Sequence, residues 1–291
     1  MTSKKNNESR ISRIFSFNNL SISLTILWPV IFVLIPFAIL TTISFLVYDD
    51  VNFFKMQFTL ENYKRLVKDD YLPVLLNSLV PSLITTIITL VISYPLTFFI
   101  TRKFSKKTQK FLIFLVIIPY WTSSLLRSYG IRIILGTEGI LNTILIHLKI
   151  ISAPLEIIYT PTAVIVGFVY LLIPLMILPL YSTMEKLDSR LIEAAYDLKA
   201  SKLQTFLKVI WPLTLPGVTV GSFMVFLPSM GMFYVADILG GAKSILIGNL
   251  VKGQFLEVRN WPMGATLNTL ILVFLLLFLL IYKEKSHWGH K

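Results

Sequence analysis

The sequence predicts an all-α integral membrane protein with six transmembrane helices. Three observations lead to this fold class: the composition, the length of the apolar runs, and the distribution of basic residues between them. Of the 291 residues, 55% are hydrophobic and only 14% are charged, whereas a soluble domain has about 25% charged residues. The chain has no cysteine, so we expect neither a disulfide framework nor a thiolate metal site.

The apolar runs are long enough to cross a membrane as helices, since a helix needs about 20 residues to cross about 30 Å of hydrocarbon. Transmembrane strands are only about 10 residues long and alternate in polarity, so strands are excluded. The six runs lie at residues 22–47, 76–100, 111–135, 161–181, 212–239 and 266–282. Together they predict a membrane domain over 22–282, with its core over 72–282, between an N-terminal tail at 1–21 and a C-terminal tail at 283–291.

The first run follows several basic residues, as the core of a secretory signal does: Lys4, Lys5, Arg10 and Arg13. It is longer than the 7 to 15 residues or so of a signal core, however, and no small-residue cleavage pattern follows it. We therefore expect it to remain as the first transmembrane helix.

The basic residues predict the orientation, because short cytoplasmic loops of membrane proteins carry an excess of lysine and arginine. The N-terminal tail, the loop "RKFSKKTQK" at 102–110 and the tail after residue 282 are all basic, whereas residues 48–75 are mixed in charge. Six crossings with both termini in the cytoplasm fit this distribution. The net charge of +12 is then explained by loops that face anionic lipid headgroups.

This orientation makes residues 182–211 the longest cytoplasmic loop, and its sequence predicts two short helices. Asp188 or Ser189 can cap the first, which is expected to run to about Leu198. Ser201 with Gln204 forms a capping-box pattern for the second. Pro212 is expected to stop or kink that second helix.

The second short helix of this loop has an apolar stripe. Leu203, Phe206, Leu207 and Ile210 lie on one face by their spacing. Such a stripe must pack either against the membrane domain or against another protein. The pattern alone leaves both alternatives open.

The loop resembles the EAA loop in the permease subunits of ATP-binding cassette (ABC) importers. The residues that carry the resemblance are Glu193, Ala194, Ala195, Asp197, Leu198, Ala200, Phe206, Pro212, Leu213, Pro216 and Gly217. It implies the type I ABC importer permease fold, in which this loop docks into a groove of a cytoplasmic ATPase. Lys199 departs from the pattern, because the family usually has glycine there, and a left-handed lysine costs about 1 kcal/mol.

Longer stretches resemble the spermidine/putrescine type of these permeases. They are "FTLENYKRL" (58–66), "PYWTSSLLRSYG" (119–130), "SKLQTF" (201–206), "MGMFYVADILGGAK" (230–243) and "LIGNLVKGQFL" (246–256). The resemblance implies polyamine import across a bacterial inner membrane. It also implies several partners: two copies of an ATPase subunit, a homologous second permease that completes a heterodimer, and an external binding protein. ATP and Mg²⁺ would be used by the ATPase, and this chain would bind no cofactor.

The middle and outer parts of the predicted spans carry candidates for the path of a cationic substrate, because ring faces and carboxylates attract cations. These candidates are Asp237, Tyr234, Trp121, Tyr120, Tyr129 and Tyr170. The alternative for each aromatic residue is a place in the interfacial belt. Asp237 has a second alternative, an ion pair with Arg127, for which we expect a structural or gating role.

The fifth run is interrupted by Pro212, Pro216, Gly217, Gly221, Pro228 and Gly231. Breaks are tolerated where the backbone lines a cavity or packs against protein, and Gly217 with Gly221 allows another helix to come close. We interpret Gly217, Gly221 and Pro228 as structural or gating residues of a moving helix. A kinked packing helix is the alternative.

No motif predicts catalysis or a metal site in this chain. A phosphate-binding loop, a zinc-ligand spacing and a Ser/His/Asp constellation are all missing from the sequence. Two rival functions remain: a secondary cation transporter, which would have no need of the loop at 193–217, and an ABC importer permease for another small solute.

Overall fold

The structure is a computed structural model that describes residues 25–68, 71–241 and 246–287. The predicted N-terminal tail at 1–21 and the end of the C-terminal tail lie outside these residues. The chain divides into two compact units, one of Met1–Asp69 with Val251–Lys291 and one of Asp70–Leu250.

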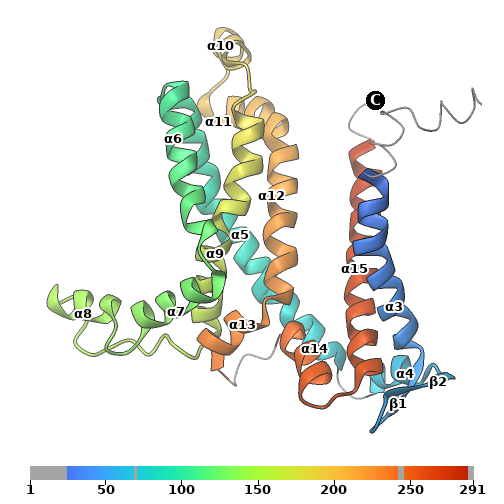
Figure 1. The fold of residues 1–291 in the computed structure, drawn as a ribbon. Coiled ribbons are helices and arrows are strands. Elements are labelled where there is room, and N and C mark those ends of the chain that lie inside the picture. Colours follow the sequence, from blue (N-terminus) through green and yellow to red (C-terminus); the bar gives the residue numbers. More distant parts are fainter. Residues whose placement is uncertain (1–24, 69–70, 242–245, 288–291) are drawn as a thin grey trace, which may run out of the picture. The chain divides into compact units, whose positions relative to one another are not determined.

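The first unit pairs the N-terminal helix with the C-terminal one. The helix over Thr25–Ser44 contains a π-helical segment, η1 (Val30–Leu34), followed by α3 (Ile35–Ser44). It packs against α15 (Trp261–His287), and the hydroxyl of Thr266 donates to the carbonyl of Ser44 at 3.2 Å. A third helix, α4 (Glu61–Lys68), follows in this unit (Figure 1).

A β-hairpin interrupts the predicted all-α fold in this unit. Strands β1 (Leu46–Asp49) and β2 (Phe53–Phe58) pair antiparallel, with Tyr48 opposite Phe54. Both strands contain β-branched or aromatic residues, which favour strands. The Asp49 carboxylate accepts a hydrogen bond from the Val51 amide at 2.9 Å, which lowers the pKa of Asp49 below its ordinary value and fixes the turn.

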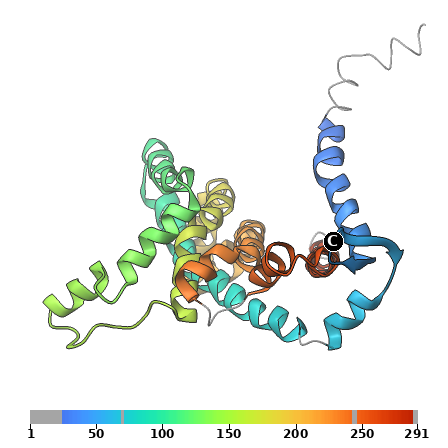
Figure 2. The same cartoon turned by 60° about the horizontal axis from the view of Figure 1, so that its bottom comes forward.

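The second unit is a bundle of four long helices. They are α5 (Tyr71–Lys103), α6 (Lys106–Ile117), α9 (Pro161–Met184) and α12 (Trp211–Gly231). Helix α9 packs against both α5 and α12, which also contact each other (Figures 1 and 2). Its Phe168, Met176 and Leu180 are fully buried. Helix α9 is therefore the centre of this unit's core.

Small residues let the neighbouring helices approach α9 closely. A Cβ atom added to Gly217 of α12 would overlap Thr183 Oγ1 and lie 2.7 Å from the carbonyl oxygen of Pro179. One added to Gly221 would lie 2.7 Å from Met176 Sδ. On α5, small hydroxyl residues at four-residue spacing, Thr85, Thr89 and Ser93, are fully buried. Small residues at helix interfaces are how membrane helices gain van der Waals contact.

The prediction of a continuous third span at 111–135 is wrong. Helix α6 passes into a 3-10 turn, η2 (Ile118–Trp121), and the chain is extended at Thr122 and Ser123, with ψ of 146° and 130°. Pro119 has no amide hydrogen to continue the helix. The chain then forms α7 (Ser124–Leu135) and α8 (Ile140–His147), which extend away from the bundle (Figures 1 and 2).

The end of α12 is followed by short elements. Met232 leaves the helical region with ψ of 69°, so the predicted fifth span does not continue as one helix to residue 239. The chain goes on through α13 (Phe233–Val235) and the π-helical η4 (Ala236–Gly240). Helix α14 (Ile247–Leu256) begins beside this end, where an added Gly248 Cβ would lie 2.6 Å from the Gly231 carbonyl oxygen.

Five helical stretches of the described residues are apolar and long enough to cross a membrane. They are Thr25–Ser44, Pro73–Lys103, Ser124–His147, Pro161–Met184 and Lys202–Gly231. Among the described residues, α15 contributes a shorter apolar stretch, Trp261–Phe274. The chain is thus a predominantly helical protein with the apolar helices of a multi-pass membrane protein.

The contact of α12 with α9 predicts the effect of enlarging Gly217. In Gly217→Ala the new methyl group meets the backbone oxygen of Pro179, which cannot rotate away, and overpacking of this kind costs about 1–3 kcal/mol. The purified variant should unfold at a lower temperature than the wild type. Gly231→Ala is the matched control on the same helix, because nothing lies within 4 Å of its added Cβ. Equal unfolding temperatures for the two variants would contradict the close contact.

Candidate functional site

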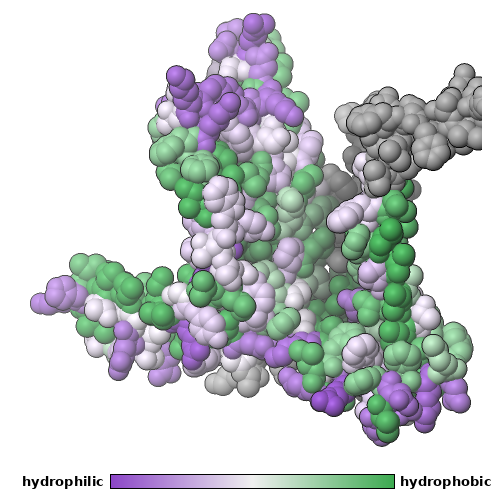
Figure 3. Space-filling model, viewed as in Figure 1, coloured by the Kyte–Doolittle hydropathy of each residue, from purple (hydrophilic) through white to green (hydrophobic). Residues whose placement is uncertain are grey.

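The loop at 182–211 folds as two short helices at one end of the bundle, as predicted. The first, α10 (Ser189–Asp197), begins at Asp188, whose carboxylate accepts from the Arg190 amide at 3.0 Å. This satisfies one of the amides that a helix start leaves without a partner. Figure 3 shows that this end of the bundle is hydrophilic, in contrast to the apolar flank below it.

The junction between the two short helices adopts the left-handed backbone conformation. Lys199 has φ of 59°. Its amide donates to the Tyr196 carbonyl at 2.8 Å, and the Ala200 amide donates to the Ala195 carbonyl at 3.0 Å. These bonds close the end of α10 in the way that a glycine usually does. The lysine therefore retains the expected turn at a conformational cost.

The second short helix, α11 (Lys202–Thr205), has the predicted capping box. The Ser201 hydroxyl accepts from the Gln204 amide at 3.2 Å, and the Gln204 side chain accepts from the Ser201 amide at 2.9 Å. Pro212 does not stop this helix, contrary to one of the two expectations. Helical structure continues from Lys202 to Gly231 through a π-helical segment, η3 (Phe206–Ile210). The extra residue of a π segment accommodates the break in the hydrogen-bond pattern.

The predicted apolar stripe divides between the bundle and solvent. Ile210 is buried, and the Phe206 ring lies 5.8 Å from the Tyr94 ring of α5. Leu203 and Leu207 are exposed, at 65% and 54%. Packing against the membrane domain is therefore confirmed for Phe206 and Ile210 alone, and contact of Leu203 and Leu207 with another protein stays a prediction.

The residues of the EAA pattern are distributed in the same way. Ala195 is buried and Ala200 is half-buried. The remaining residues of α10 and its end that carry the pattern are exposed: Glu193, Ala194, Asp197 and Leu198. Pro212 is exposed as well. The outer surface of α10 thus presents two carboxylates and a leucine to the surroundings.

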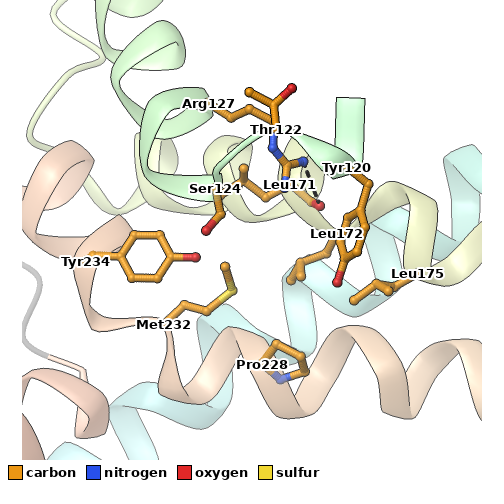
Figure 4. Close-up of a pocket in the computed structure, with 10 residues that line it drawn as sticks. All are labelled: Tyr120, Thr122, Ser124, Arg127, Leu171, Leu172, Leu175, Pro228, Met232 and Tyr234. Carbon is orange, nitrogen blue, oxygen red and sulfur yellow. Dashed lines mark hydrogen bonds between the residues drawn. The ribbon is translucent and has the colours of Figure 1, made fainter. Parts of the chain in front are cut away.

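A cavity of about 380 Å³ lies at the opposite end of the bundle (Figure 4). It is lined from η2 and α7, from α9, and from the region where α12 ends. The lining residues are Tyr120, Thr122, Ser124, Arg127, Leu171, Leu172, Leu175, Pro228, Met232 and Tyr234. Four of the residues singled out in the sequence meet here: Tyr120, Arg127, Pro228 and Tyr234.

Arg127 is the charged residue among the described residues of this lining, and none of those is acidic. Its guanidinium lies 5.5 Å from the centre of the Tyr120 ring, and its Nη1 donates to the Leu171 carbonyl at 3.5 Å. Its Nε atom is buried and has no hydrogen-bond partner. Arg127 therefore ties η2 and α7 to α9.

Asp237 lies outside the cavity lining and has a different partner from the one expected. Its Oδ1 accepts from the Asn249 side-chain amide at 2.5 Å, and Asn249 also donates to the Phe233 carbonyl at 3.2 Å. The ion pair with Arg127 is not among the contacts of the described residues. Asp237 thus joins η4 to α14.

The other three aromatic candidates lie outside the cavity lining. Trp121 is 72% exposed and makes an edge contact with Phe114; Tyr129 and Tyr170 are exposed on α7 and α9. Three residues that were not predicted, Thr122, Ser124 and Met232, also line the cavity. Thr122 and Ser124 adjoin the break between η2 and α7, and Met232 adjoins the end of α12. The proline and glycine residues near these breaks are the sequence signal that could have indicated them. No group of three or more His, Asp or Glu side chains suited to a metal ion occurs within the described ranges.

Residues 93–283 match the family model described as "Binding-protein-dependent transport system inner membrane component". The chain belongs to this family. As a member, it is a multi-pass component of the inner membrane and a permease, the non-catalytic membrane subunit of an ABC transporter.

Two curated relatives are similar over nearly the whole chain. The spermidine/putrescine transport system permease protein PotB of Salmonella typhimurium (strain SL1344) is 49% identical over 275 residues, which cover 94% of this chain and 96% of the relative. The protein of the same name from Escherichia coli (strain K12) is 50% identical over 264 residues, covering 91% and 96%.

A solved structure shares the fold of this permease at low sequence identity. It is the bacterial alginate ABC transporter in complex with an alginate pentasaccharide-bound periplasmic protein. One of its chains superposes with a TM-score of 0.77 at 15% identity, covering 97% of this chain and 98% of that one. The similarity establishes the ABC importer permease fold.

The left-handed Lys199 predicts the effect of restoring glycine there. Lys199→Gly removes a steric cost of about 1 kcal/mol, which should slow amide hydrogen exchange at the end of α10 by about fivefold. Lys199→Val should speed the exchange, because a β-branched residue fits this conformation least well. Exchange that is equally fast in all three proteins would show that the junction does not limit the stability of the loop.

Proposed function

We propose that this chain is the permease subunit of an ATP-driven importer that carries polyamines, spermidine and putrescine, into the cytoplasm. The observation that carries the proposal is the identity of about half of all residues, over nearly the whole chain, with spermidine/putrescine permeases. The alginate transporter supports the fold alone, because it is only 15% identical. A secondary transporter would have no use for the capped loop at 182–211.

The proposed topology has six membrane crossings with both chain termini in the cytoplasm. The basic turn between α5 and α6 and the capped loop lie at the same end of the bundle (Figure 1), and basic loops favour the cytoplasm. The cavity would then lie toward the outer side, where an external binding protein delivers its ligand. The α15 helix, 27 residues long, would supply the sixth crossing.

The coupling surface proposed for this chain is the outer face of α10 and its continuation. Glu193, Ala194, Asp197 and Leu198 would contact the ATPase, whereas Ala195, Ala200, Phe206 and Pro212 would shape the loop. The exposed carboxylates and the exposed Leu198 support this division. Two ATPase subunits, using ATP and Mg²⁺, would serve this chain and a homologous second permease, and this chain itself would bind no cofactor.

The cavity gives this chain a limited part in binding a polycation. It offers the ring of Tyr234 and the hydroxyl groups of Thr122 and Ser124, and ring faces attract ammonium groups. Arg127 would repel an ammonium group 4 Å away by about 4 kcal/mol at an effective dielectric constant of about 20. We infer that the carboxylates come from the second permease, with Asp237 as this chain's contribution near the outer end. Trp121, Tyr129 and Tyr170 remain candidates for path residues outside the cavity.

Polyamine uptake tests both the substrate and the loop. In cells that lack the gene, the wild type should restore uptake of labelled spermidine and putrescine and leave uptake of a neutral sugar unchanged. Glu193→Arg should not restore uptake, because it reverses a charge on the proposed docking surface. The ATPase should copurify with the wild type and with Glu138→Arg, the same charge change in an exposed residue between α7 and α8, but not with Glu193→Arg. Copurification with all three would remove the loop from the interface.

The cavity predicts a role for Tyr234 in substrate affinity. Removing its ring in Tyr234→Leu should raise the apparent KM for spermidine about tenfold, since a desolvated cation–π contact contributes about 0.5–2 kcal/mol. Phe111→Leu is the control, because it removes an exposed ring of α6 that lies outside the cavity lining, and it should change KM little. Equal changes in both variants would mean that the cavity does not select the substrate.

A further inference from the structure

Arg102, the last residue but one of α5, is bonded to the start of the capped loop. Its Nη1 donates to the Ser189 hydroxyl at 3.1 Å, and its Nη2 donates to the Leu187 carbonyl at 3.3 Å. Ser189 is the first residue of α10. The guanidinium thus joins two segments that are more than eighty residues apart in the sequence, at the helix that carries Glu193.

The Arg102 side chain is held in place on its own helix. It lies over the Phe98 ring at 5.8 Å, and its Nε atom is buried without a hydrogen-bond partner. A solvated surface arginine would have no such restriction. The fork of two donors is therefore pre-organised, which reduces the entropy lost in forming each bond.

The turn that follows Arg102 is itself rigid. The Gln109 side chain donates to the carbonyls of Thr101 at 2.9 Å and Phe104 at 2.8 Å, and Ser105 caps α6. A displacement of Arg102 is consequently shared by the ends of α5 and α6.

A second contact joins this turn to the loop. Lys106 Nζ lies 3.2 Å from Glu185 Oε1, just after the end of α9. The hydrogen bond from Lys106 lowers the pKa of Glu185 below its ordinary value. The pair is therefore present at neutral pH and is lost as the pH falls through that lowered pKa. It is largely exposed, so it adds at most about 1 kcal/mol.

An aromatic contact between α5 and the loop holds a different part of the loop. Tyr94 packs against Phe206 and Trp211, at ring distances of 5.8 and 5.5 Å. Phe206 begins η3 and Trp211 begins α12, so this contact holds the second half of the loop. Arg102 holds the first half, α10.

We propose that Arg102 is a positioning residue that transmits movement of α10 to α5. This inference rests on the proposed function, because it takes α10 as the surface that the ATPase moves. Chain continuity carries such movement to α9 and, through α11 and η3, to α12. The two bonds of Arg102 carry it to α5, whose buried face packs against both of those helices.

The test uses the complete importer in proteoliposomes, with spermidine uptake and ATP hydrolysis measured on the same preparation. Arg102→Gln should keep the ATPase bound and hydrolysing ATP but lower the spermidine carried per ATP about tenfold. Tenfold corresponds to about 1.4 kcal/mol, the order of one hydrogen bond from a charged donor. Lys103→Gln removes the same charge one residue later, from an exposed side chain, and should behave as the wild type.

Two further variants identify the bonds themselves. Arg102→Lys retains the charge but not the two donors of the guanidinium group. The spermidine it carries per ATP should lie between the values for Arg102→Gln and the wild type. Ser189→Ala should add nothing in the Arg102→Gln background, because the bond that it removes is already lost.

Failure of this inference is distinct from failure of the proposed function. If spermidine uptake by the wild-type complex does not depend on ATP hydrolysis, the proposed function is contradicted. If uptake by the wild type does depend on ATP hydrolysis, and Arg102→Gln carries the same amount of spermidine per ATP hydrolysed, only the positioning role is overturned. A lower yield of complex with an unchanged ratio also overturns it, because Arg102 is then a tether.

Discussion

The close contact of α12 with α9 is the constraint on which the rest of the second unit depends. In hydrocarbon, helices gain nothing from leaving the solvent, so their association depends on van der Waals contact between closely approaching backbones. Gly217 and Gly221 provide that approach, and the fully buried side chains of α9 fill the space around it. The capped loop connects the end of α9 to the start of α12. Its geometry is therefore set by the spacing of the two helices that it connects.

Local features of the site could be predicted from the sequence because their signals lie within a few residues. Asp188 and Ser201 cap helices through amides two and three residues later, and Lys199 occupies the turn that a family glycine would. The break after Trp121 was missed, since an average over an apolar run does not register two extended residues inside it. The partner of Asp237 was missed for another reason. Asn249 lies twelve residues away, and no local periodicity connects the two.

The positive charge of the cavity comes from Arg127, which is held there by its contacts with neighbouring elements. A polycation needs acidic or aromatic surroundings, yet Arg127 faces the cavity and is fixed there by the Tyr120 ring and the Leu171 carbonyl. This position is explained by the contacts of Arg127, which connect η2 and α7 to α9. The chain has no continuous helix between η2 and α7, so these contacts hold the break together. No acidic residue occurs among the described residues that line the cavity, so the cavity offers no carboxylate of its own to balance an ammonium group.

The helix from Lys202 to Gly231 connects the two functional ends of the unit. Its 30 residues span about 45 Å at 1.5 Å per residue, with the capping box at one end and Pro228 of the cavity wall near the other. Because the π segment η3 keeps the helix continuous past Pro212, the loop and the cavity wall belong to one helical element. Gly217 and Gly221 lie within this length, at the points of closest approach to α9. The atoms of α9 leave no room for even a Cβ atom at either point, so the helix is held most tightly between the loop and the cavity.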